Sequence, residues 1–270
     1  MLSILKNASP NSTTYYVGDN LTHLKHLKDC TLYCKQLFNL PISVKQIIVE
    51  DPQLEFYKLS HKVNFPYTFN NLYTKGNNCN IHPTSVIGDG VTLGDNVTIG
   101  PNSVIYSKTQ IGDNVRIDSN VTIGTEGMMW VWDNNKKIYL RQLGGVIIED
   151  NTILCSGCVI VRGSANEVTY ISEGSNLAPN CAIGHGTYIG KYVHLANNVS
   201  TGGSSYISDY NFLGSGVIIS AGVKLLTNDI ILGAGAVVTK NITTSGVFVG
   251  LPAKFLKSSK GKLSGMPLWR

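Results

Sequence analysis

The stretch from residue 80 to residue 124 reads NIHPTSVIGDGVTLGDNVTIGPNSVIYSKTQIGDNVRIDSNVTIG and decides the fold. An aliphatic side chain recurs at every sixth position, at Ile81, Ile87, Leu93, Ile99, Ile105, Ile111, Ile117 and Ile123. A period of six fits neither an amphipathic helix nor a simple hairpin meander. The phase resumes at Ile148 and again at Ile171, lapses at Thr201, and is expected to continue through Ile231 and Val237.

Each hexad predicts one short strand that ends in a turn. A small or β-branched residue, such as Val91, stands two positions before each aliphatic one, so each hexad offers one large and one small inward side chain. The glycine that often follows the aliphatic residue, with Asp or Asn after it, is expected to supply the tolerance of positive φ. Three hexads would close one coil of a prism, and stacked coils would pair parallel strands about 4.8 Å apart. Twenty-three hexads predict seven to eight coils of a mainly β protein.

This pattern resembles the hexapeptide repeat of the left-handed parallel β-helix acyltransferases, over roughly residues 80 to 256. The resemblance implies the left hand of the coil. It also implies a homotrimer whose active sites lie between neighbouring prisms.

The chain divides into three parts. Residues 1–78 show no hexads, and IIVEDPQLEFYKL predicts a strand entering a helix with Asp51 as N-cap and Pro52 at the first helical position, as in a small α/β cap domain for a nucleotide sugar. Residues 79–250 form the β-helix, interrupted by a loop at 124–146 and a shorter break at 163–170. Residues 251–270 form a short basic tail, expected to be only partly ordered.

The 124–146 loop carries Met128, Met129, Trp130, Trp132 and Tyr139, a large apolar load for an exposed excursion. Such a load is expected to cover something, on its own prism or a neighbour. The segment from Trp130 to Ile171 resembles the UDP-3-O-acylglucosamine N-acyltransferase family, which has a tryptophan loop, a Gln-Leu-Gly step and an Arg-Gly insertion. In that family an Ile-x-His hexad supplies the catalytic histidine, which falls on His185 here.

The next stretch, GHGTYIGKYVHLANNVSTGGSSYI at 184–207, resembles acetyl-CoA-dependent sugar acetyltransferases, with a second histidine at His194 and a Gly-Gly at 202–203. The closing IILGAGAVVTKNITTSGVFVGLPAKFL is shared by many CoA-dependent members. The resemblance implies acyl-CoA, first of all acetyl-CoA, as a co-substrate, with no cofactor bound permanently. Its expected contacts are His194, Gly203, Gly214, Ala221, Ala234, Lys240 and Lys254.

The expected function is therefore transfer of an acyl group, first of all acetyl, to the amine of a nucleotide-linked amino-deoxysugar for lipopolysaccharide or O-antigen synthesis. His185 would be the general base, because histidine exchanges protons near neutral pH. Trp130, Trp132 and Asn180 would bind the sugar nucleotide. The alternatives are a lipid A-type N-acyltransferase that uses acyl carrier protein, an O-acetyltransferase, and a non-catalytic scaffold.

Composition limits other functions. The net charge of +5 is modest, and neither a nucleic-acid partner, a secretory signal nor an apolar run long enough to span a membrane is indicated, so we expect a cytoplasmic protein. Cys155 and Cys158 form a CxxC without a second pair, and Cys158 and Cys181 are expected to fill the core. A prism-type carbonic anhydrase would need zinc-binding histidines, and only His82, His185 and His194 lie in the prism, so no metal is expected.

Overall fold

A computed structural model describes residues 1–65 and 67–259, and the C-terminal part of the predicted tail, 260–270, lies outside the described residues. The chain folds into two compact units. Of the described residues, 67–125, 145–162 and 168–259 form the prism unit, and 1–65, 126–144 and 163–167 form the small unit. The first segment of the small unit thus ends before residue 78, the boundary that the sequence predicts, and the unit also includes most of the predicted loop at 124–146.

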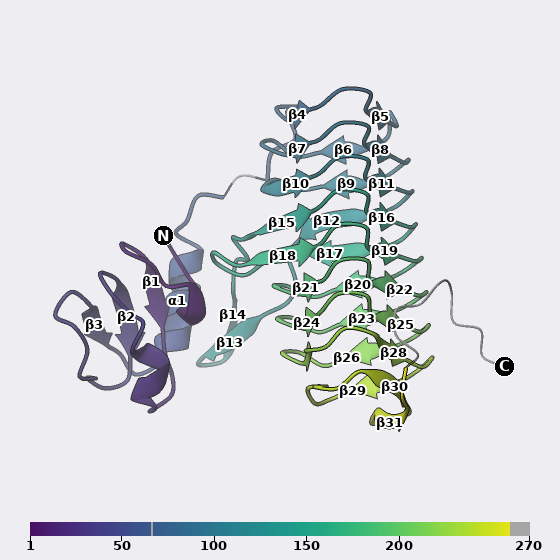
Figure 1. Ribbon diagram of the computed structural model, residues 1–270. Helices are drawn as coiled ribbons and strands as arrows, with labels where there is room; N and C mark the ends of the chain where they lie inside the picture. The colour runs from purple at the N-terminus through teal and green to yellow at the C-terminus, as the bar shows by residue number, and fades with distance from the viewer. Residues whose placement is uncertain (66, 260–270) are drawn as a thin grey trace. The chain divides into compact units, whose positions relative to one another are not determined.

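Three parallel sheets form the walls of the prism unit, and the chain visits them in turn, one strand per sheet in each coil (Figure 1). The first contains β4 (Thr74–Lys75), β7 (Thr92–Leu93), β10 (Thr109–Ile111), β15 (Gly145–Ile148), β18 (Val168–Ile171), β21 (Tyr188–Ile189), β24 (Tyr206–Ile207) and β27 (Lys224–Leu225). The second contains β5 (Asn80–Ile81), β8 (Thr98–Ile99), β11 (Arg116–Ile117), β16 (Ile153–Leu154), β19 (Asn176–Leu177), β22 (His194–Leu195), β25 (Phe212–Leu213), β28 (Ile230–Leu232) and β30 (Gly246–Val249), with β31 (Lys254–Lys257) added antiparallel. The third contains β6 (Val86–Ile87), β9 (Val104–Ile105), β12 (Thr122–Thr125), β17 (Val159–Val161), β20 (Ala182–Ile183), β23 (Ser200–Thr201), β26 (Ile218–Ile219) and β29 (Val237–Val238). The predicted left-handed parallel β-helix is confirmed.

The predicted inward residues fill the core of the prism. The hexad aliphatics are buried from Ile87 to Leu225, as are Val91 and the two cysteines Cys158 and Cys181. The predicted phase is wrong beyond Leu225, because Leu213 pairs with Leu232 and Ile219 with Val238. One extra residue between β27 and β28 therefore moves Leu232 and Val238 inward, in place of Ile231 and Val237.

The glycine that often follows the aliphatic residue is predicted to supply the tolerance of positive φ, but the structure gives it another role. The residue with positive φ comes two positions later, for instance Asn96 (58°), Asn114 (55°) and Gly90 (75°). The glycine itself permits close stacking of coils. A Cβ built on Gly94 would lie 2.7 Å from the carbonyl carbon of Gly112 in the next coil. Glycine is needed there for space between coils, and asparagine or glycine supplies the left-handed turn.

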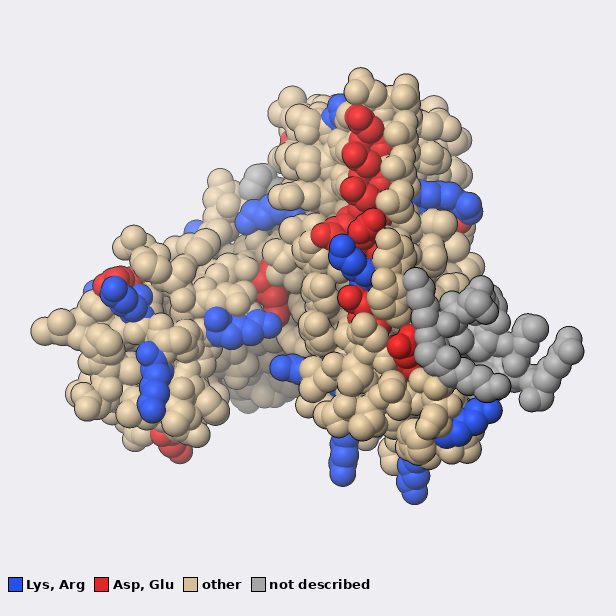
Figure 2. All heavy atoms as spheres, in the orientation of Figure 1, with Lys and Arg blue, Asp and Glu red and all other residues tan. Residues whose placement is uncertain are grey.

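One corner of the prism, between the first and second sheets, carries a column of mostly acidic residues, which we call the acidic corner: Asp95, Asp113, Asp150, Glu173, Lys191 and Asp209 (Figure 2). Stacked like charges repel, but each of several carboxylates accepts a backbone N–H from the coil before it. Asp113 accepts from the N–H of Asp95 and Asp150 from that of Asp113, both at 2.7 Å. Such charge-assisted bonds offset the repulsion.

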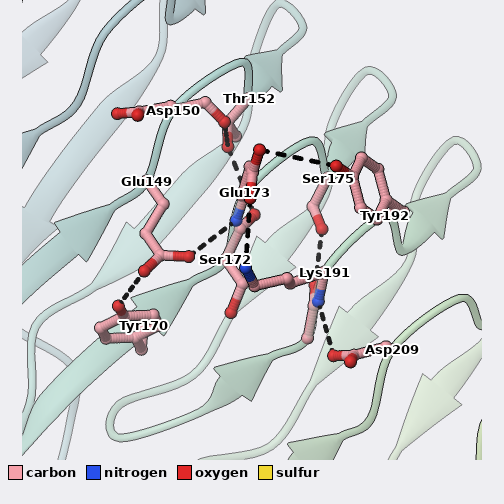
Figure 3. A network of polar contacts seen from close by, with 11 residues as sticks. Glu149, Asp150, Thr152, Tyr170, Ser172, Glu173, Ser175, Lys191, Tyr192 and Asp209 are labelled. Carbon is pink, nitrogen blue, oxygen red and sulfur yellow. Dashed lines mark hydrogen bonds and ion pairs between the residues drawn. The ribbon is translucent and has the colours of Figure 1, made fainter.

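A polar network joins the lower half of this corner (Figure 3). Glu149 accepts hydrogen bonds from the hydroxyl of Tyr170 and the N–H of Glu173, and its bond to Tyr170, with burial, raises the pKa of that phenol to about 12. Lys191 interrupts the acidic column and pairs with Glu173 at 3.1 Å. The network therefore ties three successive coils together at their edge.

In the small unit, three parallel strands, β1 (Thr13–Tyr15), β2 (Thr31–Cys34) and β3 (Lys45–Ile48), lie beside α1 (Pro52–Ser60). Two short 3-10 helices, Leu5–Asn7 and Leu21–Leu24, complete the connections. The predicted start of α1 is confirmed: the Asp51 carboxylate accepts the N–H of Leu54 at 3.0 Å, and Pro52 is the first helical residue. Such a cap stabilises a helix by about 1 kcal/mol.

The predicted aromatic loop is a hairpin of the small unit, made of β13 (Trp130–Asp133) and β14 (Lys136–Tyr139). Its inner face, Met129, Val131 and Ile138, packs against Phe56 and Tyr57 of α1. Lys58 of α1 also pairs with Asp133 at 3.0 Å. The loop thus covers the helix of the small unit, a partner that the sequence did not indicate.

Replacing Gly94 by alanine tests the close approach of the coils. Its Cβ would clash with backbone, so we expect a lower melting temperature and a loss of about 1–3 kcal/mol in the free energy of unfolding. Gly90→Asn is the matched control, because a Cβ there meets nothing within 4 Å and asparagine tolerates the left-handed φ. Equal melting temperatures for Gly94→Ala and wild type would contradict this account.

Candidate functional site

His185 lies at the corner between the third and first sheets, two residues after the buried Ile183. The second residue after the inward aliphatic position of each coil forms a column along this edge, which we call the histidine corner: Asp89, Ser107, Thr125, Arg162, His185, Gly203, Ala221 and Lys240. The register shifts by one residue between the third and fourth of these coils, where Thr125 pairs with Val161. The residues that follow His185 in this column, Gly203 and Ala221, are small. Only small side chains therefore lie along this edge between the imidazole of His185 and Lys240.

The ring of His185 lies against Gly203. A Cβ built on Gly203 would lie 2.2 Å from Nε2 of His185, so only glycine leaves room for the ring in this position. The carbonyl of His185 accepts the N–H of Ser204 at 2.6 Å. The coil below therefore supports both the ring and the backbone of His185.

Both interruptions of the repeat start at this same corner. The chain leaves the prism unit after Thr125 and again after Arg162, in the two coils that precede His185. Stacking along the corner is thus broken immediately before His185.

Arg162 binds backbone carbonyl groups at the break. Its fully buried guanidinium donates to the carbonyl of Gly124 at 2.6 Å and to that of Ser107 at 2.9 Å. It also lies over the ring of Tyr67, 5.4 Å from the centroid. Burial lowers the pKa of the neighbouring Lys108, and the positive charge of Arg162 adds to this effect.

Six of the seven predicted acyl-CoA contacts lie on three different parts of the prism, and the seventh, Lys254, lies near Lys240. Gly203, Ala221 and Lys240 share the histidine corner with His185. Gly214 and Ala234 lie at another corner, between the second and third sheets, close to the turn of the next coil. His194 lies on β22 in the middle of the second sheet. Within one prism, Gly214, Ala234 and His194 are on other sides from His185.

Lys240 and Lys254 are brought together at the end of the prism. They line a cavity of about 360 Å³ with Thr243, Thr244 and Phe248. Two ammonium groups and two hydroxyls suit an anionic ligand such as a phosphate. Lys240 is at the same time the last residue of the histidine corner, so this cavity and His185 lie along one edge.

The predicted sugar-nucleotide residues are spread over both units. Trp130 and Trp132 are 41 % and 53 % exposed on the outer face of β13, with their rings 5.4 Å apart and Nζ of Lys137 4.4 Å from the centroid of Trp130. Asn180 lies in the prism unit at the corner that holds Ala234, with φ of 63°, and is a left-handed turn residue of the repeat. Neither unit contains all three.

The family described as Bacterial transferase hexapeptide (six repeats) matches residues 76–107 and 93–125. The matched residues lie in the first coils of the β-helix, from β5 to β12. None of the described residues forms a helix long and apolar enough to cross a membrane, and residues 1–65 and 67–259 contain no group of three or more His, Cys, Asp or Glu side chains that could hold a metal ion.

Two curated relatives extend this resemblance to acyltransferases. The chain is 40 % identical over 132 residues to UDP-3-O-acylglucosamine N-acyltransferase of Idiomarina loihiensis, and 29 % identical over 131 residues to that of Delftia acidovorans. Each match covers 48 % of this chain and 38 % of the relative, so the chain spans well under half the length of these enzymes. The predicted resemblance to hexapeptide-repeat acyltransferases is confirmed.

Solved structures support the fold. The UDP-N-acetylglucosamine acyltransferase from Campylobacter jejuni superposes with a TM-score of 0.62 at 22 % identity, covering 69 % of this chain and 71 % of that one. A second UDP-N-acetylglucosamine acyltransferase gives a TM-score of 0.64 at 21 % identity, covering 72 % and 73 %. At this identity the likeness concerns the β-helix.

His194 provides a test by pH. Burial lowers the pKa of its imidazole from the ordinary value of 6.5, and its ring stacks on that of Phe212 with centroids 5.3 Å apart. Because the unfolded chain binds the proton more readily, this residue costs stability as pH falls through 6.5 toward the lower folded value.

We therefore expect His194→Phe, which repeats the ring found at Phe212, to gain melting temperature relative to wild type as pH is lowered from 7 to about 5. Melting curves at several pH values measure the difference. A difference that stays constant over this range would contradict the assignment.

Proposed function

We propose that this protein transfers an acyl group from a thioester to an amine of a nucleotide-linked amino sugar, with His185 as the general base and with active sites completed in a homotrimer. The observation that carries the proposal is the histidine corner, which aligns His185, two small residues and the lysine-lined cavity along one edge. The confirmed resemblance to UDP-3-O-acylglucosamine N-acyltransferases supports the acceptor class.

The chemistry needs a neutral amine to attack the thioester carbonyl. The nitrogen forms a bond to the carbonyl carbon, the carbon–sulfur bond breaks, and the thiol leaves. The proton lost by the amine goes to the imidazole of His185, which returns to its neutral form by giving a proton to the departing thiolate or to solvent. Glycine-rich turns at this corner offer backbone N–H groups for the developing oxyanion.

We place acyl-CoA, first of all acetyl-CoA, along the histidine corner. Gly203 and Ala221 would leave room for the pantetheine arm, and Lys240 with Lys254 would meet the phosphates. The exposed Trp130 and Trp132 of the small unit offer aromatic surface for the nucleobase, and Lys137 between them offers a charge for the diphosphate.

The lipid A reaction is a second candidate that the relatives favour at least equally. Their printed name describes an N-acyltransferase of a UDP-linked acylglucosamine. In that case the donor would be an acyl carrier protein instead of acyl-CoA. The reacting groups and the role of His185 would be the same, so donor and acceptor must be tested independently.

The first experiment measures thiol release from two donors, acetyl-CoA and acylated acyl carrier protein. Each donor is tested with UDP- and dTDP-linked amino sugars and with the corresponding sugars that carry a hydroxyl in place of the amine. We expect turnover with an amino sugar, and a loss of about a hundredfold or more in kcat for His185→Ala. His82→Ala, at the far end of the prism, is the control and should keep wild-type rates. If His185→Ala turns over at nearly the wild-type rate, His185 is not the general base. If wild type turns over with no pair of donor and acceptor, the proposed acyltransferase function is wrong.

Lys240→Glu tests the donor. If the lysine-lined cavity holds the phosphates of CoA, the reversed charge should raise KM for acetyl-CoA at least tenfold and leave KM for the sugar nucleotide unchanged, since about 1.4 kcal/mol of binding corresponds to tenfold. Lys224→Glu, an exposed lysine on β27, is the matched control. An unchanged KM for acetyl-CoA in Lys240→Glu would place CoA elsewhere or favour the carrier-protein donor.

A further inference from the structure

Most turns of this β-helix contain the same backbone hydrogen bond, in which the residue with positive φ donates its N–H to a carbonyl in the turn of the preceding coil. Two examples at the histidine corner are Ser204, which donates to the carbonyl of His185 at 2.6 Å, and Gly222, which donates to that of Gly203 at 2.9 Å. This bond fixes each such turn to the one before it. Asn102 is an exception away from the histidine corner, because its N–H goes to the hydroxyl oxygen of Thr84 at 3.0 Å.

The turn that contains His185 is fixed differently. Gly186, its left-handed residue, donates its N–H to the hydroxyl oxygen of Thr169 at 2.9 Å. The hydroxyl of Thr169 in turn donates to the carbonyl of Val161 at 2.6 Å. The reason is the break in the corner: after Arg162 the chain leaves the prism unit, so the side chain of Thr169 takes the place that a turn carbonyl has elsewhere.

A second hydroxyl acts on the other side of the histidine. Thr201 is the one lapse in the aliphatic series, and it is buried. Gly184, immediately before His185, donates its N–H to the carbonyl of Thr201 at 3.0 Å and also approaches its hydroxyl at 3.2 Å. The N–H groups of the residues before and after His185 are therefore bound to buried threonines.

We propose that Thr169 is a positioning residue for His185, supported by Thr201, and that its hydroxyl holds the histidine turn at the break in the prism. The reason for the hydroxyl is not packing. Thr109 and Val146 occupy the same inward position in the two preceding coils. The Thr109 hydroxyl has no hydrogen-bond partner among the described residues, and Val146 shows that valine fits the position.

This inference rests on the proposed function for its catalytic consequence, but the turn can be tested directly. The variants are Thr169→Val, which removes the hydroxyl at constant shape, Thr169→Ser, which keeps it, and Thr109→Val as the matched control. Hydrogen–deuterium exchange of peptides covering Gly184–Tyr188, followed by mass spectrometry, measures whether the turn is held. We expect faster exchange there in Thr169→Val, and wild-type exchange in the other two variants.

In the acyl-transfer assay, Thr169→Val should lower kcat about tenfold with KM for both substrates unchanged, since a small displacement of a catalytic group costs rate rather than binding. Thr169→Ser should restore the rate, and Thr109→Val should leave it unchanged. A wild-type kcat in Thr169→Val would overturn the positioning role.

The two failures are distinguishable. If wild type transfers no acyl group to any acceptor, the proposed function fails, and the exchange experiment alone decides the role of Thr169 in the turn. Faster exchange confined to Thr169→Val then supports that role. Exchange in Thr169→Val equal to wild type overturns it, whatever the activity.

Discussion

Everything in the prism unit depends on the close stacking of successive coils. Equivalent residues 18 positions apart lie directly above one another, as the parallel pairing of β20 with β23 and of β23 with β26 shows. The strands of neighbouring coils are about 4.8 Å apart, so a side chain meets its equivalents before it meets anything else. Glycines allow the coils to stay in contact, and the aliphatic columns fill the interior. A column of charged residues needs partners that offset the repulsion between its stacked charges. In the acidic corner these partners are backbone N–H groups and Lys191.

This regularity explains why so much of the fold could be predicted from the sequence. A hexad position has nearly the same surroundings in every coil, so the pattern of Ile87 or Val91 repeats wherever the coil repeats. The prediction failed where the cause lay outside the hexad. Gly94 is needed because of Gly112 in the next coil, and the run Ile230–Ile231–Leu232 offers three aliphatic residues, among which sequence alone could not choose the inward ones. The small unit joins three segments that are distant in the sequence, and no local sequence pattern predicts that they assemble.

In the candidate site, too, the features set by the repeat could be predicted from the sequence, and those that arise outside the repeat could not. Spacing placed His185 at a corner, because it follows an inward residue by two positions. The acyl-CoA residues were chosen from resemblance and by small size, and size does not say which corner a residue occupies. Gly203 and Ala221 share the corner of His185, since they follow it by multiples of 18 residues, whereas His194, nine residues on, lies on another wall. Arg162 and Thr169 were missed because their roles arise from the break in the prism. The signals that pointed to them were the lapse at Thr201 and the interruption directly after Arg162.

The discontinuity of the small unit has a consequence for the order in which the molecule is made. Its strands and α1 leave the ribosome before the first coils of the prism, but the hairpin that covers α1 comes about seventy residues after α1, and the last segment follows residue 162. The first coils of the prism are therefore complete in the nascent chain while Phe56 and Tyr57 still lack the hairpin side chains Met129, Val131 and Ile138. The small unit therefore begins before the first coils of the prism and is completed only after them, at residue 167.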